Sequence, residues 1–362
     1  MWTVIILLAL ALLVLSLVYL SGRVCALPLW QGLFRSARSA RLAAVGLLLL
    51  LLAALWLWLG TVNTVVCFLH ALGIWLLCDA LALLLRLALG HPLPYDAVGA
   101  AAIVLTLAVL LIGWRNAHEV RRTEYRLDGE RTLRIVGFSD AHIGAVFSGK
   151  ELSRYVARIN AESPDLVVIV GDFVDDDTKR EDMLDACAAL SALRPRLGSY
   201  YVFGNHDGGY YSSVHRGYGR EELIAALEQN GVRVLEDESA ALPGNIRLIG
   251  RQDAQHRNRM SAGQLCGGCA DGEYTVLLDH QPTDYDNEQA AGVSLVLSGH
   301  THGGQFIPIR PLIKALGHND LLYGHEKRGD TDFIVSSGIA DWALKFRTGC
   351  FSEYFVVDIG GK

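Results

Sequence analysis

Charged residues are almost missing from the first third of the sequence. Of the 32 basic and 38 acidic residues in the chain, residues 1–114 contain only five and two. A segment with so little charge cannot give a folded domain an ordinary water-exposed surface. It therefore excludes a soluble domain at this end of the chain.

Four long apolar runs replace the missing charges. Each is close to the ~20 residues that a helix needs to cross a bilayer. None has the polar stripe of a surface helix, so we predict membrane spans rather than a buried helical bundle. The first run also lacks a basic start and a small-residue cleavage site, which favours a retained anchor over a signal peptide. The predicted spans are residues 2–20, 42–59, 64–85 and 97–114.

The arginines beside the runs bear on the orientation in the membrane. The loop at 21–41 carries four arginines, whereas the N-terminus and the turn at 60–63 carry no charge. The positive-inside rule places that loop in the cytoplasm, and four spans then leave the C-terminal domain at the outer face. The opposing signal is a group of four arginines directly after the last run. The two groups are Arg23, Arg35, Arg38 and Arg41, and Arg115, Arg121, Arg122 and Arg126.

Three polar residues fall inside the runs, where they are costly. Asp79 and Arg86 are seven positions apart on one helical face, so we expect them to pair near a membrane edge. The alternative is a transport pathway that uses Asp79 and His70. Replacing these two residues would impair function only in a transporter.

Residues 115–362 have the opposite character. They hold 27 of the basic and 36 of the acidic residues, and this acidic balance argues against non-specific nucleic-acid binding. Cysteine is sparse, and Cys266 and Cys269 form one CxxC pair without the second pair of a zinc ribbon. We expect either a disulfide, if the domain is external, or free thiols.

Short apolar runs alternate with helical stretches in this second part, which predicts an α/β layered sandwich. We divide the chain into a transmembrane region at 1–115 with four helices, a linker at 116–131 and a domain at 132–362. Helices are expected at 150–161, 180–193 and 220–230. Strands are expected at 133–138, 166–170, 200–203, 246–249, 274–278, 293–297, 333–335 and 354–357.

Polar residues follow five of these strands at the point where each one ends. Because the carboxyl ends of strands in an open sheet converge on one crevice, residues far apart in sequence can meet there. Carboxylate, amide and imidazole donors without a thiolate suit manganese, iron, zinc or a similar divalent ion. Seven candidates exceed the needs of one ion with an open position, so we predict two metal ions bridged by one carboxylate. The candidates are Asp140, His142, Asp172, Asn205, His280, His300 and His302.

The same motifs carry a family resemblance. Asp140-Ala141-His142, Gly171-Asp172, Gly204-Asn205-His206-Asp207, His280 and Gly299-His300-Thr301-His302 occur in this order. The set resembles the calcineurin-like metallophosphoesterase superfamily over about 132–357. The stretch GHTHGGQ at 299–305, with the apolar N-terminal runs, resembles its transmembrane branch.

The resemblance implies a four-layer sandwich, in which two β-sheets are flanked by helices, and a dinuclear metal centre. One metal is expected on Asp140, His142 and His302, and the other on Asn205, His280 and His300, with Asp172 bridging. His206 is expected to be catalytic, beside the substrate phosphate, with Asp175 or Asp207 orienting its neighbours.

The sequence departs from the resembled pattern near its end. Ser337 stands where related membrane members have an arginine in V-S-R-G, and Ser352 precedes Glu353 where Pro-Glu is usual. The first change removes an anion contact near the site. Arg347 or Lys345 are the candidates to supply it instead.

Together these features predict a membrane-anchored hydrolase of a phosphate ester or pyrophosphate bond, in contact with membrane lipids. The anchor makes a lipid-linked substrate such as UDP-2,3-diacylglucosamine reasonable, although that substrate requires a cytoplasmic site. The alternative is a membrane sensor or scaffold that binds metal without catalysis. Metal analysis with a phosphodiesterase assay distinguishes the two.

Overall fold

The structure is a computed structural model that describes residues 2–129, 131–210, 213–270, 272–307, 310–311, 315 and 317–360. The chain divides into two compact units, Met1–Trp114 and Arg115–Lys362.

The first unit is helical. Its elements are α1 (Trp2–Ala26), α2 (Pro28–Gln31), α3 (Ala37–Leu89) and most of α4 (Tyr95–His118). Among the described residues, three helices are long and apolar enough to span a membrane: Leu7–Ala26, Ala37–Leu89 and Tyr95–His118.

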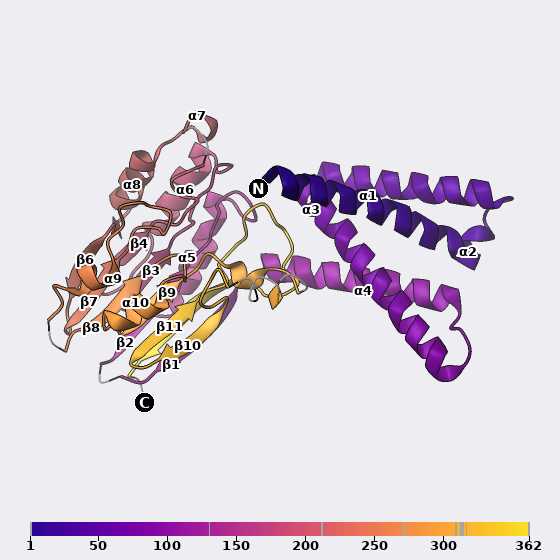
Figure 1. The fold of residues 1–362 in the computed structure, drawn as a ribbon. Helices are drawn as coiled ribbons and strands as arrows, with labels where there is room; N and C mark the ends of the chain where they lie inside the picture. Colours follow the sequence, from indigo (N-terminus) through magenta and orange to yellow (C-terminus); the bar gives the residue numbers. More distant parts are fainter. Residues whose placement is uncertain are drawn as a thin grey trace. The chain divides into compact units, whose positions relative to one another are not determined.

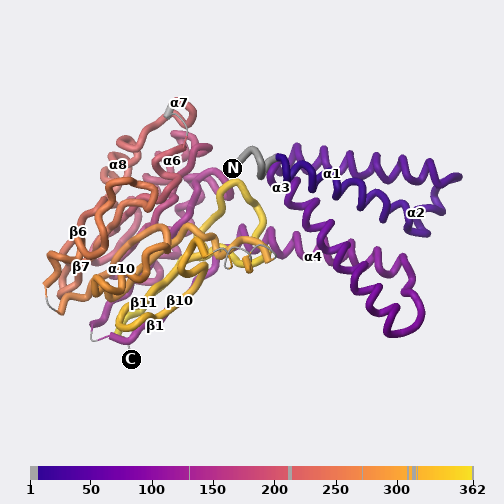
Figure 2. The backbone as a smooth tube through the Cα atoms, in the orientation of Figure 1, coloured from indigo at the N-terminus to yellow at the C-terminus, as the bar shows by residue number. Residues whose placement is uncertain are grey.

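The bend in α3 explains why four spans were predicted. The runs at 42–59 and 64–85 lie on either side of Gly60, whose φ of 80° and ψ of 175° interrupt the helix. Glycine adopts a positive φ without the clash that a Cβ would cause. The tube in Figure 2 follows the chain as it turns back after the first half of α3. Two of the predicted spans are thus the halves of one bent helix.

The predicted pairing of Asp79 with Arg86 is wrong. Arg23 Nη2 lies 2.5 Å from Asp79 Oδ2, and the Tyr19 hydroxyl also donates to this carboxylate. Arg86 is exposed. Helix α1 packs against α3 around Leu20 and other apolar residues, which brings Arg23 to Asp79. The cation that pairs with Asp79 therefore comes from the neighbouring helix and not from α3 itself.

The second unit contains two six-stranded mixed sheets (Figure 1). In spatial order, the first sheet contains β1 (Arg121–Leu127), β12 (Glu353–Ile359), β2 (Leu133–Phe138), β3 (Leu166–Val170), β4 (Ser199–Val202) and β5 (Val232–Val234). The second contains β10 (Gly324–Arg328), β11 (Thr331–Val335), β9 (Leu295–Ser298), β8 (Tyr274–Leu278), β7 (Ile246–Gly250) and β6 (Glu238–Leu242).

Helices cover the outer face of each sheet. The first sheet packs against α5 (Leu152–Ala161), α6 (Arg180–Leu190) and α8 (Arg220–Gln229). The short helix η1 (Gly149–Glu151) contacts α5 and α6, and α7 (Ser213–Arg216) precedes α8. The second sheet packs against α9 (Ala262–Cys266) and α10 (Tyr285–Ala290). The short helix η2 (His302–Gly304) follows β9.

Alternate residues of the central strands enter different cores. On β3, Val168 and Val170 join the core between the sheets, whereas Val167 and Ile169 face the helices. On β8, Val276 and Leu278 face the other sheet, and Leu277 packs towards α9 and α10. This alternation follows from the two-residue period of a strand, and burial on both faces explains the uninterrupted apolar runs. The four-layer sandwich is confirmed.

One strand lies within the segment 116–131 that the sequence analysis treats as a linker. Strand β1 pairs in parallel with β12, so that Arg121 is opposite Glu353 and Leu127 is opposite Ile359. In its sequence RRTEYRL only Tyr125 and Leu127 are apolar, so the alternation is too short to signal a strand. The thiols of Cys266 and Cys269, at the end of α9, are free.

Candidate metal centre

The proposed ligands lie on loops that leave the carboxyl ends of five strands. Asp140 and His142 follow β2, Asp172 follows β3, Asn205 follows β4, His280 follows β8, and His300 and His302 follow β9. In the first sheet, β2 and β3 are parallel neighbours. In the second sheet, β7, β8, β9 and β11 are parallel neighbours in this order. The carboxyl ends of these strands therefore meet at one edge of the sandwich.

Six of the seven candidate ligands form two groups. Asp140, His142 and His302 form one group, and Asp172, His280 and His300 form the other. Within each group the potential ligand atoms all lie within 4.8 Å of one another. The residues are buried except for His300, which is partly exposed.

Asp172 stands between the two groups. Its Oδ2 atom lies 3.0 Å from His280 Nε2 in its own group and 3.8 Å from His142 Nε2 in the other. In the first group, His302 Nε2 lies 3.6 Å from Asp140 Oδ1. The Asp172 carboxylate is therefore within reach of ligands from both groups.

Five of the seven residues have a positive φ. The angles are 53° at Asp140, 36° at His142, 50° at Asp172, 70° at His300 and 48° at His302. This region is sparsely populated for residues with a Cβ, and such strain persists only where surrounding contacts enforce it. Strained positions gather at functional sites, so their concentration here supports a function for this edge.

Neighbouring groups lie close to the second ring nitrogens of three histidines, although that of His142 has no hydrogen bond among the described residues. His280 Nδ1 lies 2.7 Å from the Val170 carbonyl, which leaves the lone pair on Nε2. His302 Nδ1 lies 3.1 Å from Asp341 Oδ1, and His142 Nδ1 lies 3.4 Å from Asp175 Oδ2. A metal-binding histidine is oriented in this way, with its distal N–H on a carbonyl or carboxylate.

Two buried nitrogens test whether these residues fit a metal ion. The Nε2 atoms of His142 and His280 are buried and have no hydrogen-bond partner in the described part of the chain. A buried polar atom without a partner costs about 1–3 kcal/mol. Both atoms face the Asp172 carboxylate, whose buried negative charge requires a nearby cation. The donor set therefore fits divalent cations.

The pKa shifts of the histidines in the site differ in direction. Burial, reinforced by His280, lowers the pKa of His300 to about 4. Burial also lowers the pKa of His206. At His142 burial acts in the same direction, but Asp175, Asp172 and Asp140 outweigh it and raise the pKa.

Asn205 and His206 extend from the loop after β4. Asn205 Nδ2 donates to the Tyr210 hydroxyl at 2.7 Å, and its Oδ1 lies 3.4 Å from Gln281 Nε2. The backbone N–H of His206 donates to Asp172 Oδ1 at 2.8 Å, which ties this loop to the central carboxylate.

The imidazole of His206 lies beside the first group of ligands. Its ring centroid is 5.0 Å from that of His142, 5.2 Å from that of Tyr210 and 5.8 Å from that of Trp342. Tyr210 and Trp342 are both exposed. The ring thus lies between the buried donors and an aromatic rim.

Asp207 organises the backbone of two ligand loops. Its Oδ2 accepts hydrogen bonds from the Asp172 N–H at 2.8 Å and from the Gly204 N–H at 2.7 Å, and Oδ1 accepts one from the Val174 N–H at 3.0 Å. Burial, together with the charge of Asp172, raises the pKa of Asp207 to about 6. The sequence motif marked Asp207 as an orienting residue, and these bonds are consistent with that interpretation.

Arg347 does not contact the open part of the site. It is fully buried, and Nε donates to Asp341 Oδ2 at 2.5 Å, while Nη1 donates to the Gly338 and Phe351 carbonyls. The expectation that Arg347 supplies the anion contact missing at Ser337 is therefore wrong, because its nitrogens face Asp341, His302 Nδ1 and backbone carbonyls. Ser337 donates to the Phe351 carbonyl at 2.6 Å.

Asp341 is a residue that sequence reasoning missed. It lies between His302 Nδ1 and Arg347, and these two partners hold the pKa of its carboxyl well below its usual range although burial alone raises it. No strand or ligand motif adjoins Asp341, so only the folded structure reveals its contact with a candidate ligand.

Gly204 is required by close packing against Asp172. A Cβ at this position would lie 2.3 Å from Asp172 Oδ1 and 2.5 Å from Asp172 N. We expect Gly204→Ala to displace Asp172 and reduce phosphoesterase activity by roughly 10²-fold, the loss typical of misplaced catalytic geometry. Steady-state hydrolysis of bis-p-nitrophenyl phosphate measures the change.

The control for this substitution is Gly263→Ala, at an exposed position on α9. A Cβ there meets nothing within 4 Å. This variant should keep the wild-type rate. Equal rates for both alanine variants would show that the contact between Gly204 and Asp172 does not matter for activity.

Comparison with known proteins agrees with the fold. Residues 133–304 match the family model of the calcineurin-like phosphoesterases. An uncharacterised metallophosphoesterase of Aquifex aeolicus is 30% identical over 268 residues, which cover 71% of this chain and 98% of that protein. The chain belongs to the calcineurin-like phosphoesterase family, whose members are metal-dependent hydrolases of phosphoesters.

Two other relatives locate the chain more narrowly. An uncharacterised metallophosphoesterase of Campylobacter jejuni is 29% identical, with 72% of this chain and 69% of that protein covered. A transmembrane protein with metallophosphoesterase domain from Danio rerio is 31% identical, with 70% of this chain covered. The match spans only 60% of the length of this second relative. Together with the apolar helices, it supports a membrane-associated metallophosphoesterase.

Proposed function

We propose that residues 132–362 hydrolyse a phosphate ester or pyrophosphate bond with two divalent metal ions, and that residues 1–115 anchor this domain in a membrane. The observation that carries the proposal is the place of Asp172, whose Oδ2 atom is within 4 Å of imidazole nitrogens from both groups of donors. A carboxylate shared in this way is what a two-metal site requires.

Each group of donors would hold one ion. Asp140, His142 and His302 would hold the first, and His280, His300 and Asn205 the second, with Asp172 common to both. Oxygen and imidazole donors without thiolate favour manganese, iron or zinc. When bound, such ions supply Lewis-acid polarisation of the phosphoryl group and lower the pKa of water.

His206 would act directly on the substrate. Its ring lies beside His142 and next to the exposed Tyr210, where a phosphoryl group entering from the rim must pass. We propose that its N–H donates a hydrogen bond to a phosphoryl oxygen or a proton to the leaving oxygen.

Replacement of His206 tests this role. We expect His206→Ala to lower kcat for bis-p-nitrophenyl phosphate by about 10²- to 10⁴-fold, the usual contribution of a positioned acid, while both metals remain bound. Metal content is measured by elemental analysis of the same sample. Wild-type turnover with metal retained would remove His206 from the mechanism, and two bound metals without any turnover in the wild type would favour a non-catalytic sensor.

The membrane anchor favours a lipid-linked phosphate as substrate. UDP-2,3-diacylglucosamine is one substrate of this kind, but it requires a cytoplasmic active site, whereas the arginines of the loop at 21–41 favour an outer-face domain. Modification of a cysteine introduced at the exposed Asp177 by a membrane-impermeant maleimide, in intact cells, decides the side. Labelling supports the outer face, and protection until lysis contradicts it.

A further inference from the structure

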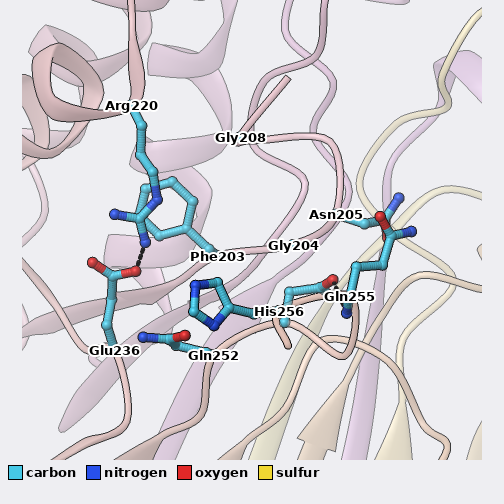
Figure 3. A pocket seen from close by; sticks show the side chains of 10 residues that line it. Phe203, Gly204, Asn205, Gly208, Arg220, Glu236, Gln252, Gln255 and His256 are labelled. Atoms are coloured by element: carbon cyan, nitrogen blue, oxygen red, sulfur yellow. Dashed lines mark hydrogen bonds and ion pairs between the residues drawn. The ribbon is translucent and has the colours of Figure 1, made fainter. Parts of the chain in front are cut away.

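A pocket whose rim carries several polar side chains adjoins the proposed metal centre at Asn205. It has a volume of about 200 Å³ and is lined by the loop that follows β4, by Arg220 at the start of α8, and by residues 252–256 after β7 (Figure 3). Asn205 belongs both to this lining and to the candidate ligands. A substrate with its phosphoryl group at the metal centre can therefore place the adjoining group in the pocket.

The one arginine that lines the pocket already has an anionic partner, and the Asp253 carboxylate is hydrogen-bonded to a neutral carboxamide. Arg220 forms an ion pair with Glu236, and its guanidinium carbon lies 4.2 Å from the centroid of the Phe203 ring. Both carboxylate oxygens of Asp253 accept from Gln281 Nε2, at 3.0 and 2.8 Å. Among the described lining residues, no cation is thus left for a second phosphate, which would meet two carboxylates instead. Burying an uncompensated anion there is unfavourable.

The remaining polar side chains of the lining are able to form hydrogen bonds with a ligand. Figure 3 shows the imidazole of His256 and the carboxamides of Gln252 and Gln255 around the same space. Carboxamides offer both a donor and an acceptor, as does a neutral imidazole, which matches the hydroxyl group of a ligand. Gln252 Oε1 is buried and has no hydrogen-bond partner among the described residues, so rotation of this carboxamide towards a ligand hydroxyl gains a bond without breaking one.

We propose that this pocket receives an uncharged, polyhydroxylated group, and that the substrate is a phosphate ester of a sugar or polyol rather than a nucleoside pyrophosphate. The inference rests on the proposed phosphoester hydrolysis. A volume of about 200 Å³ is below the ~300 Å³ at which sites for drug-sized ligands begin, which suits a single sugar ring or polyol. The same chemistry occurs in a free polyol phosphate and in the headgroup of a phosphorylated lipid.

Competitive inhibition distinguishes binding in the pocket from binding at the metal centre. The full chain in detergent with Mn²⁺ hydrolyses p-nitrophenyl phosphate, and inhibition constants are measured for orthophosphate and for myo-inositol 1-phosphate. Orthophosphate reports the metal centre, whereas the inositol ester also reports the pocket. We expect the wild type to bind the inositol ester at least tenfold more tightly than orthophosphate, and Gln252→Ala/His256→Ala to reduce this ratio about tenfold.

These two substitutions are suitable because no hydrogen bond of either side chain is broken in the described structure. Gln229→Ala, at an exposed position on α8, is the matched control and keeps the wild-type ratio. An unchanged ratio in the double variant, or a wild type that binds both inhibitors equally, overturns the proposal. Absence of p-nitrophenyl phosphate hydrolysis in the wild type is a different outcome, because it overturns the proposed function itself.

Turnover distinguishes the two sources of the ligand. Hydrolysis of phosphatidylinositol 4-phosphate in mixed micelles, but not of inositol phosphate, identifies a lipid headgroup, and the reverse identifies a free polyol phosphate. Either result supports the proposal. Hydrolysis of a nucleoside diphosphate ester with neither polyol ester turned over contradicts it.

Discussion

Asp172→Asn should lower phosphoesterase activity by at least roughly 10³-fold and reduce the bound metal below two ions per chain. The substitution keeps the shape of the side chain but removes the negative charge that lies 3.0 Å from His280 Nε2 and 3.8 Å from His142 Nε2. Loss of a shared ligand weakens both sites, and a loss of about 4 kcal/mol in transition-state stabilisation corresponds to this change in rate. Elemental analysis and steady-state kinetics on the same preparation measure the two effects.

The control for Asp172 is Asp177→Asn. The side chain of Asp177 is 92% exposed, so this substitution removes one negative charge nearby without touching the donors. Its activity and metal content should match the wild type. A variant of Asp172 that retains two metals and the full rate would show that this carboxylate does not bridge them.

Arg347→Met should destabilise the second unit by about 3–5 kcal/mol, the usual cost of leaving a buried charge without its partner. Arg347 and Asp341 are both fully buried, and Asp341 also faces His302 Nδ1 at 3.1 Å. For a unit of this size the midpoint of thermal unfolding should fall by roughly 6–20 °C. Because Asp341 then loses the partner that holds it, metal affinity should also fall, by about 10- to 100-fold.

The exposed pair of Arg180 and Glu222 is the matched control for this buried pair. Their side chains are 52% and 35% exposed, so Arg180→Met should change the free energy of unfolding by less than about 1 kcal/mol. Differential scanning calorimetry compares the two variants. Equal, small shifts in the midpoint would mean that Arg347 is not needed to balance Asp341.

The positions of the candidate ligands were predictable because each follows an apolar strand directly. Asp140, Asp172 and His280 come within two residues of the ends of β2, β3 and β8. Parallel strands bring their carboxyl ends to a common edge, so the order of the strands mattered less than the position of each residue after its strand.

The supporting contacts around these ligands were not predictable in the same way. Asp341 and Arg347 lie in irregular structure between β11 and β12, where no periodic pattern constrains their direction. The direction of Arg347 depends on which buried carbonyls and carboxylates surround it. For this reason the sequence suggested a contact with substrate, and the structure shows a contact with Asp341.

The strands that the sequence pattern missed have one property in common. They are the edge strands of the two sheets, which bury fewer apolar side chains than central strands and therefore lack a continuous apolar run. Strand β10, GHEKR, alternates between exposed and half-buried residues. The missed strands are β1, β5, β6 and β10.

The sequence by itself determined the membrane helices, the central strands and the loop position of each candidate ligand, because burial and strand ends leave local, periodic signals. Only the tertiary structure decided which charges pair across elements. Asp79 pairs with Arg23 of another helix, and Arg347 with Asp341 rather than substrate. Such pairings depend on distances between segments that no local pattern records, since a buried charge takes the nearest partner in space.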